Sequence, residues 1–418
     1  MARSEFFNPV DTAVMGGVPT PPINELVAMQ GGDYVLRARG GEVTKVPAER
    51  SVVPHDPEGF AQLMTVLRGP GDTVYVTQPT LSSKSEDGGR TWTTLDSDRK
   101  FTHNAGKSQV LSDGTFITVI EEGPGGRKPL SGTNLAAVWA SYDEGRTFEQ
   151  ISHIPVPDEF AECDSTGSAF QMTRLPDDTL LWVTCAGNDK WDRSKMDRST
   201  NRWKKADTRV YLSGKNAGFT FCSTDGGHTW EGPNWMADWF SEGGMAGMAS
   251  GKLLSAMRYS RPLMPGELET LTGGDHRPFT WEHGVANTFK HVLLADSRDN
   301  GRTWTGHRLL TTVYGQTYGF PTGLSDGTAV VLHDHRYPRG EPHPLRSMVS
   351  HDEGDTWEDE VYYLVCTDRG ASYGASVTLD DDTVVTVAGI PDADAGEGSD
   401  GAHGHSSMTV VRWKPERD

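Results

Sequence analysis

An eight-residue phrase recurs five times along this chain, and it constrains the fold more than any other feature of the sequence. The shared pattern is S-x-D-x-G-x-T-[W/F], and its copies lie at Ser85–Trp92, Ser141–Phe148, Ser223–Trp230, Ser297–Trp304 and Ser350–Trp357. A pattern of this length does not recur by chance. Recurrence of one local unit is the sequence signature of a repeat architecture.

Each copy has the residues of a tight turn between two β-strands. The apolar segment AAVWA precedes the copy at Ser141, and such a segment predicts a strand. The Asp side chain can accept hydrogen bonds from backbone N–H groups further along, and the Gly can adopt a positive φ. The Thr and Trp begin the next strand, where the indole can pack beneath the turn. We therefore expect a stapled hairpin corner whose role is structural and not catalytic.

A second pattern of strand, tight turn and strand alternates with the corner phrase. Its turns carry the dipeptides D-G, D-D or S-G, which favour β-hairpins, and its copies begin at Leu111, Leu175, Met248, Leu324 and Leu379. One hairpin of each kind gives four antiparallel strands, which form one blade of a β-propeller. The sequence therefore predicts an all-β, six-bladed propeller.

The predicted propeller occupies residues 1–418 as one domain. Its blades are expected near residues 55–100, 101–155, 156–235, 236–310, 311–362 and 363–415. The sixth blade has no corner phrase after its last hairpin. We therefore expect the N-terminal segment Tyr34–Gly40 to supply the missing outer strand and close the ring.

Composition agrees with this architecture and excludes two classes of partner. Hydrophobic residues make up 35 % of the chain, which contains 48 Gly and 24 Pro, as expected for short strands joined by many turns. A formal net charge of −19 repels nucleic acid and anionic membranes, and no apolar run reaches the roughly 18 residues that span a bilayer. The start, MARSEFFNPV, lacks the apolar core of a signal peptide. We expect a cytoplasmic or unknown location. The sequence does not indicate the oligomeric state.

The repeats resemble the sialidase (neuraminidase) superfamily, whose six-bladed propellers carry the corner phrase as the Asp box, or BNR repeat. The segment YGASVTLDDDT from Tyr373 is similar to the family's inner strand with its nucleophilic Tyr. The segment EGGMAGMASGKLLSAMR has the family's spacing between a Glu and an Arg, here Glu242 and Arg258. The resemblance implies that Tyr373 is the nucleophile, that Glu242 is its base and that Arg258 binds an anionic sugar.

These residue types suit a sugar with a carboxylate beside its anomeric carbon. Such a sugar repels a carboxylate nucleophile, so sialidases use a Tyr oxygen instead, and a neighbouring Glu takes its proton. An Arg guanidinium binds the sugar carboxylate with a fork of N–H groups. Two family features have no counterpart here: an R-I-P phrase near the N-terminus, and an acid/base Asp in the first-blade segment VTQPTLSSKS.

Further polar residues are predicted at the same rim without reference to the family. The first strand of a blade begins, and its second strand ends, at one edge of the sheet, so these positions should face a common pocket. Glu121 is a candidate acid/base at a second-strand end. Candidate substrate-binding residues at the rim are His103, Asp164, Tyr318, His333 and Tyr337.

The densest polar stretch is LHDHRYPRG, from Leu332 to Gly340. In it, Arg336 could neutralise a uronic acid while His335 moves a proton, which is lyase chemistry; a structural ion-pair cluster is the alternative. Two His residues on one strand could bind a metal, but no third ligand lies at a diagnostic spacing. We expect no metal and no cofactor.

Two insertions follow predicted second strands, at residues 187–210 and 261–284. The first is basic with two Trp, and the second begins with Arg261, a further candidate ligand of the substrate. Either they are ordinary long loops, or they cover the pocket and contact an acidic glycan through Trp and basic side chains.

The sequence thus favours a carbohydrate-active enzyme, an exo-acting glycoside hydrolase similar to sialidases, with an oligosaccharide or glycoconjugate as its partner. One alternative is a polysaccharide lyase or another glycosidase that uses His335 and Arg336. The other alternative is a propeller that binds glycans without catalysis.

Overall fold

The computed structural model describes most of the β-structure of the chain. The described residues are 12–14, 21–54, 65–78, 81–98, 107–121, 136–155, 172–187, 196–197, 202–203, 216–238, 240–262, 288–311, 319–333, 344–367, 374–391 and 405–417. Within these ranges there is a single α-helix, α1 (Ile23–Gln30), and every other regular element is a strand. None of the described helical structure is long and apolar enough to cross a membrane.

Four sheets are built from consecutive antiparallel strands. The first contains β4 (Thr65–Arg68), β5 (Val74–Thr77), β6 (Ser82–Ser85) and β7 (Thr93–Leu95). The second contains β8 (Ser108–Val110), β9 (Phe116–Glu121), β10 (Ala136–Ser141) and β11 (Glu149–Ile154). The third contains β12 (Thr173–Arg174), β13 (Leu180–Gly187), β16 (Asn216–Ser223) and β17 (Glu231–Asp238). A separate two-stranded sheet, β14 (Met196–Asp197) with β15 (Arg202–Trp203), lies between β13 and β16 in the sequence. The fourth contains β18 (Phe240–Gly247), β19 (Leu253–Pro262), β20 (Thr288–Ser297) and β21 (Thr305–Thr311), with β1 (Thr12–Val14) parallel to β21 at its outer edge.

The remaining strands form one sheet of nine. One end of it is the meander β22 (Phe320–Gly323), β23 (Ala329–His333), β24 (Leu345–Ser350) and β25 (Glu360–Val365). The other end is β26 (Gly374–Thr378), β27 (Val384–Pro391), β28 (His405–Trp413) and β3 (Glu42–Val53), and β2 (Tyr34–Arg39) joins the two ends.

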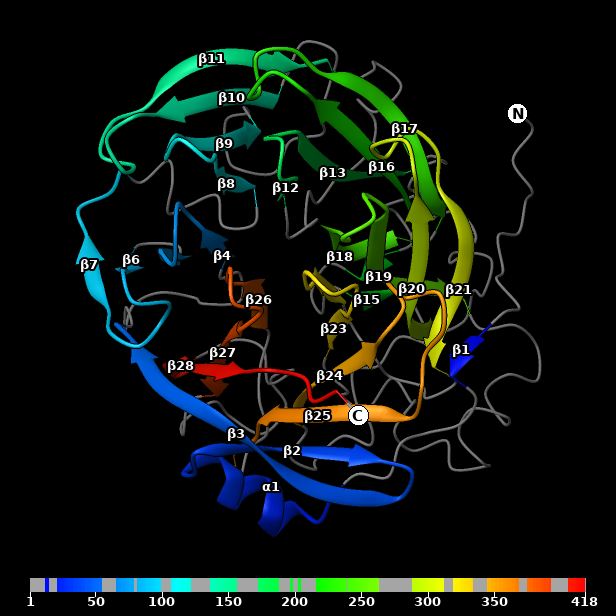
Figure 1. The fold of residues 1–418 in the computed structure, drawn as a ribbon. Coiled ribbons are helices and arrows are strands. Elements are labelled where there is room, and N and C mark those ends of the chain that lie inside the picture. Colours follow the sequence, from blue (N-terminus) through cyan, green and yellow to red (C-terminus); the bar gives the residue numbers. More distant parts are fainter. Residues whose placement is uncertain are drawn as a thin grey trace.

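The innermost strands of these sheets meet around a common axis (Figure 1). Each contacts the innermost strands of its two neighbours, in the closed order β4, β8, β12, β18, β22, β26 and back to β4. Hydrogen bonds link neighbours directly: Thr173 Oγ1 donates to the Met245 carbonyl oxygen at 2.7 Å, and the Thr322 and Thr378 hydroxyls lie 2.7 Å apart. The fold is therefore all-β and propeller-like, as the repeats predicted.

The N-terminal hairpin closes the ring with a different strand from the one expected. The strand that pairs with β28 is β3, whereas the segment expected there, Tyr34–Gly40, forms β2 one position further out and pairs with β25. Both strands belong to one hairpin, and β3 contains Pro47 and several charged residues, which weaken its strand signal in the sequence.

The corner phrase folds as the predicted stapled turn. In the last copy, Ser350 Oγ donates to Asp352 Oδ1 at 2.8 Å, and Asp352 accepts hydrogen bonds from the backbone N–H and the hydroxyl of Thr356 at 2.8 and 2.5 Å. Trp357 Nε1 donates to the Gly354 carbonyl at 3.0 Å. The same Ser-to-Asp and Thr-to-Asp bonds recur in the other four copies.

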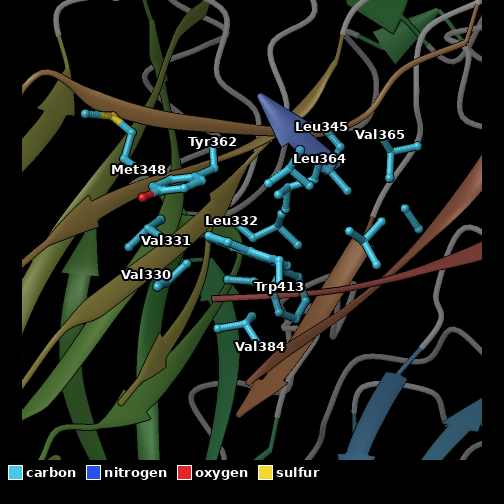
Figure 2. Close-up of a cluster of buried hydrophobic side chains, with 14 of the residues drawn as sticks. Val330, Val331, Leu332, Leu345, Met348, Tyr362, Leu364, Val365, Val384 and Trp413 are labelled. Atoms are coloured by element: carbon cyan, nitrogen blue, oxygen red, sulfur yellow. The ribbon is translucent and has the colours of Figure 1, made fainter. Parts of the chain in front are cut away.

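A large apolar core lies between the two ends of the nine-stranded sheet. Figure 2 shows part of it, with Leu332, Leu345 and Trp413 among the buried side chains. The ring of Trp413 packs against that of Tyr362 with centroids 4.8 Å apart. Burial on this scale fixes the relative positions of the inner strands, and these carry the candidate site.

Candidate functional site

The candidate site lies at the edge of the sheets where the innermost strands begin, here called the rim edge. An antiparallel hairpin brings the start of its first strand and the end of its second strand to one edge. In the fourth sheet these ends are the beginning of β18 and the second half of β19. Several of the residues predicted from the sequence fall at this edge.

Glu242 of β18 and Arg258 of β19 occupy directly opposed positions across the strand pair. A register shift between Phe240 and Glu242 marks an irregularity immediately before this pair, and bulges of this kind often redirect a side chain beside an active site. Arg258 is half-buried, and its Nε is out of contact with solvent. Two residues predicted to act together, sixteen positions apart in the chain, are thus neighbours in the sheet.

Gly243 explains how β18 can lie so close to β19 beside Glu242. A Cβ atom at this position would be 2.4 Å from the carbonyl oxygen of Ala256 and 2.6 Å from the Cα of Met257. Any side chain larger than hydrogen would push the two strands apart. The glycine therefore maintains the register in which Glu242 opposes Arg258.

Further along β19, the strand carries other residues toward the rim. Tyr259 opposes His291 of β20, and both side chains are almost completely buried, with 0 and 1 % of their surface exposed. Arg261, predicted to bind substrate, opposes Phe289 near the end of the strand.

The other predicted residues within described strands are Glu121 and His333. Glu121 is the last residue of β9 and opposes Ala136 of β10. His333 is the last residue of β23, is 0 % exposed and opposes Arg346 of β24, which is 5 % exposed. Both predicted residues thus end a second strand, as expected, but His333 is enclosed by protein. Its role as a substrate ligand stays a prediction.

The remaining predicted site residues lie outside the described residues: Tyr373, His335, Arg336, Tyr318, Tyr337, His103 and Asp164. The chain connects three of them to described strands. Tyr373 immediately precedes β26, Tyr318 shortly precedes β22, and His335 follows the end of β23. Their assignment to the rim rests on this chain order.

One group of hydroxyl side chains at the rim edge of the first sheet was not predicted from the sequence. Thr65 begins β4, Thr77 ends β5 and Ser82 begins β6, and the three residues oppose one another across the strands. Their exposed fractions are 2, 0 and 1 %. The only sequence signal is that hydroxyl residues flank apolar strands in TVLR and VYVT. Burial of hydroxyl groups is visible only in three dimensions.

A cavity of about 260 Å³ lies at the opposite end of β19, away from the rim edge. Its lining includes Lys252, which is 1 % exposed and pairs with Asp355 at 2.7 Å. This ion pair joins the turn before β19 to the corner phrase of the neighbouring sheet, so we assign the cavity a structural role. Within the described ranges, no three His, Cys, Asp or Glu side chains lie close enough to hold a metal ion.

Comparison with known proteins supports the fold at low sequence identity. No family model and no curated protein matches the sequence. A Hadza microbial sialidase is similar with a TM-score of 0.55 and 18 % identity, over 92 % of this chain and 74 % of the other. An α-L-arabinofuranosidase from Fusarium graminearum is similar with a TM-score of 0.53 and 13 % identity, over 87 % of this chain and 97 % of the other. A sialidase from Streptococcus pneumoniae gives a TM-score of 0.52 and 12 % identity, over 85 % of this chain and 68 % of the other.

Proposed function

We propose that the protein is an exo-acting glycoside hydrolase that cleaves a terminal acidic sugar, on a propeller of six blades. The observation that carries the proposal is the opposition of Glu242 and Arg258 at the rim edge, in the spacing that the sialidase resemblance implies. The closed circuit of inner strands supports six blades, with the nine-stranded sheet contributing two of them through its two four-strand meanders.

The chemistry assigns one role to each residue. The phenol oxygen of Tyr373 forms a bond to the anomeric carbon as the glycosidic C–O bond breaks, and Glu242 accepts the phenol proton. Glu121 is the candidate donor of a proton to the departing oxygen. Arg258 binds the sugar carboxylate in its guanidinium fork. A water oxygen then bonds to the anomeric carbon as the bond to Tyr373 breaks, the water gives a proton to the Glu121 carboxylate, and the phenol regains its proton from Glu242.

The similar structures include enzymes named for acidic and for neutral sugars, a sialidase and an arabinofuranosidase. Similarity of fold therefore does not identify the sugar that this protein cleaves. Arg258 favours the acidic one, because a half-buried guanidinium is best matched by a carboxylate.

The test is a panel of 4-methylumbelliferyl glycosides of N-acetylneuraminic acid, D-glucuronic acid and L-arabinofuranose, with fluorescence as the readout. We expect release from an acidic glycoside, and loss of release in Tyr373→Phe. Tyr142→Phe is the matched control, because Tyr142 is 65 % exposed at a corner turn, and it should retain full activity.

Two other results would replace the proposal. Ultraviolet absorbance from an unsaturated uronate, with a polyuronate as substrate, would indicate a lyase that uses His335 and Arg336. Binding of glycans without turnover of any substrate would indicate a non-catalytic glycan-binding protein.

A further inference from the structure

Arg258 lies on the face of the fourth sheet that packs against the nine-stranded sheet. Side chains alternate along a strand, so Leu254, Ala256 and Arg258 of β19 share one face. Leu254 on this face reaches the nine-stranded sheet, since its two Cδ atoms lie 3.0 and 3.3 Å from the position that a Cβ atom would take at Gly354. The innermost strand β22 of the nine-stranded sheet contacts both β18 and β19. The guanidinium that we assign to the sugar carboxylate therefore borders the junction between these two sheets.

Gly319, immediately before β22, makes a close contact beside Arg258. A Cβ atom at Gly319 would be 2.7 Å from the Cβ of Ala256 and 3.0 Å from Cγ1 of Val292. Ala256 lies two residues before Arg258 on the same face of β19, and Val292 of β20 directly opposes Arg258. We call this contact, Gly319 with Ala256 and Val292, the rim junction.

The rim junction is this close because Gly319 has no side chain. The φ of Gly319 lies outside the left-handed region, so its backbone conformation is open to any residue and the restriction is one of space. Carbon atoms in good contact are about 3.5–4.0 Å apart, so a methyl group at Gly319 would require β22 and β19 to separate by roughly 1 Å. Because the Cβ of Ala256 is bonded directly to the backbone, no change of rotamer relieves the clash.

A glycine stands in the same place relative to two other predicted site residues. Gly243 directly follows Glu242 near the start of β18, and Gly374 directly follows Tyr373 and begins β26. A Cβ atom at either glycine would lie less than 3.0 Å from an atom of an adjoining strand, as it would at Gly319. Close approach of the backbone where an innermost strand begins is thus a repeated feature of the sheets that carry the candidate site.

Gly323 makes a comparable contact at the other end of β22. It lies four residues after Gly319, so the two glycines are on the same face of the strand. A Cβ atom at Gly323 would be 2.6 Å from the carbonyl oxygen of Gly247, the last residue of β18. The intervening Thr322 points to the other side, where its hydroxyl lies 2.7 Å from that of Thr378 in β26. Gly323 therefore spaces the same two sheets, but away from the rim edge.

We propose that Gly319 is a positioning residue, which fixes the width of the rim junction and thereby the place of Arg258 relative to the substrate. The inference rests on the proposed function and adds that two sheets define the site: the fourth sheet supplies Arg258, and β22 limits the space beside it. A guanidinium binds a carboxylate at about 2.7–2.9 Å, and a displacement of about 1 Å can lower a rate about 100-fold. Because this bond forms on binding and persists through the reaction, its loss should raise KM and leave kcat nearly unchanged.

The experiment compares Gly319→Ala with Gly323→Ala on the acidic glycoside that the wild type cleaves. Both variants should lower the midpoint of chemical denaturation, because each places a methyl group in a filled contact. Gly319→Ala should also raise KM about 10- to 100-fold, the range for one charge-assisted hydrogen bond, with kcat within about twofold of the wild type. Gly323→Ala is the matched control and should keep the KM of the wild type.

Two further variants change the other side of the rim junction. In Gly319→Ala with Ala256→Gly, the atom 2.7 Å from the new methyl group is removed, so KM should return toward the wild-type value. Val292→Ile instead enlarges the side chain that faces Gly319. It should raise KM in the same direction as Gly319→Ala, and it takes the place of that variant if Gly319→Ala does not fold.

Two outcomes overturn the inference while leaving the proposed function intact. One is a wild-type KM in whichever of Gly319→Ala and Val292→Ile folds. The other is an equal rise in KM in Gly319→Ala and Gly323→Ala, which would show that general loosening of the two sheets weakens binding. A wild type that cleaves no acidic glycoside would instead refute the proposed function, and the inference with it.

Discussion

Glu242 and Arg258 oppose each other directly across β18 and β19, although sixteen residues separate them in the chain. The turn that joins the two strands lies at the other end of the hairpin, at residues 248–252. The pair therefore lies well away from that turn, on the side of the hairpin that faces the rim edge. A carboxylate position and a guanidinium position fixed in this way form the basis of the proposed site.

Replacement of Arg258 tests the assignment of the acidic sugar. Arg258→Lys keeps the charge but loses the fork of N–H groups, so we expect kcat/KM for an acidic glycoside to fall about 10- to 100-fold, the range for one or two charge-assisted hydrogen bonds. Arg302→Lys is the control, because Arg302, in the corner turn before β21, pairs with Glu231 at the start of the outer strand β17. Equal kinetics in both variants would remove Arg258 from the site.

Replacement of Gly243 tests how the strands support the site. Gly243→Ala places a methyl group 2.4 Å from the Ala256 carbonyl oxygen. We expect a loss of about 1–3 kcal/mol in the free energy of unfolding, typical of overpacking, together with reduced activity. Gly31→Ala should change neither, since nothing lies within 4 Å of a Cβ there and its φ is −92°. Full stability of Gly243→Ala, measured by chemical denaturation, would argue against the close approach.

Removal of a corner carboxylate should affect stability and not chemistry. Asp352→Ala deletes the acceptor of bonds from Ser350 and Thr356, and we expect a loss of about 1–3 kcal/mol in the free energy of unfolding. Asp359→Ala, at an exposed position two residues after the phrase, should be silent. A variant of Asp352 that melts normally but has lost turnover would contradict the structural role.

The corner carboxylates also predict how the fold responds to acid. The backbone N–H of Thr147, together with the hydroxyls of Thr147 and Ser141, lowers the pKa of Asp143 to about 2. In the other four corners burial opposes the shift, but the hydrogen bonds outweigh it and the pKa values of the corner Asp residues are again lowered.

A lowered carboxyl pKa stabilises the native state fully above the unfolded value of about 3.9 and loses this effect as the pH falls through the native value. Melting temperatures measured from about pH 5 downward should therefore drop most steeply between about pH 4 and pH 2. Asp143→Asn should flatten that drop, because the amide does not titrate. An identical profile in the variant would show that Asp143 does not contribute to the response to acid.

The repeats made the architecture predictable because each corner phrase is stabilised by contacts between residues that are close together in the sequence. Ser, Asp, Gly and Thr lie within eight residues, and their hydrogen bonds need no distant partner, so the phrase itself specifies the turn. The Glu242–Arg258 register was predictable for a similar reason, since it belongs to one hairpin with a short turn.

The closing strand was mispredicted because its pairing is not local. β2 and β3 are adjacent strands of one hairpin, and the choice between them as the partner of β28 depends on contacts more than 300 residues away in the chain. Val43 and Val52 of β3 are exposed, so its burial pattern does not single it out in the sequence. The buried hydroxyl groups of Thr65, Thr77 and Ser82 were not predicted because Ser and Thr are ordinary strand residues, and their burial depends on the packing of the sheets.

The most direct test of the account is a double-mutant cycle on Tyr373 and Glu242. The glycosidase proposal requires both to act in one step, so Tyr373→Phe should cut kcat on the cleaved glycoside by orders of magnitude while sugar binding persists. Glu242→Gln should do nearly as much, and the double variant should be little slower than either single one. Additive losses in kcat, or wild-type kcat in either single variant, would contradict the mechanism and direct attention to His335 and Arg336.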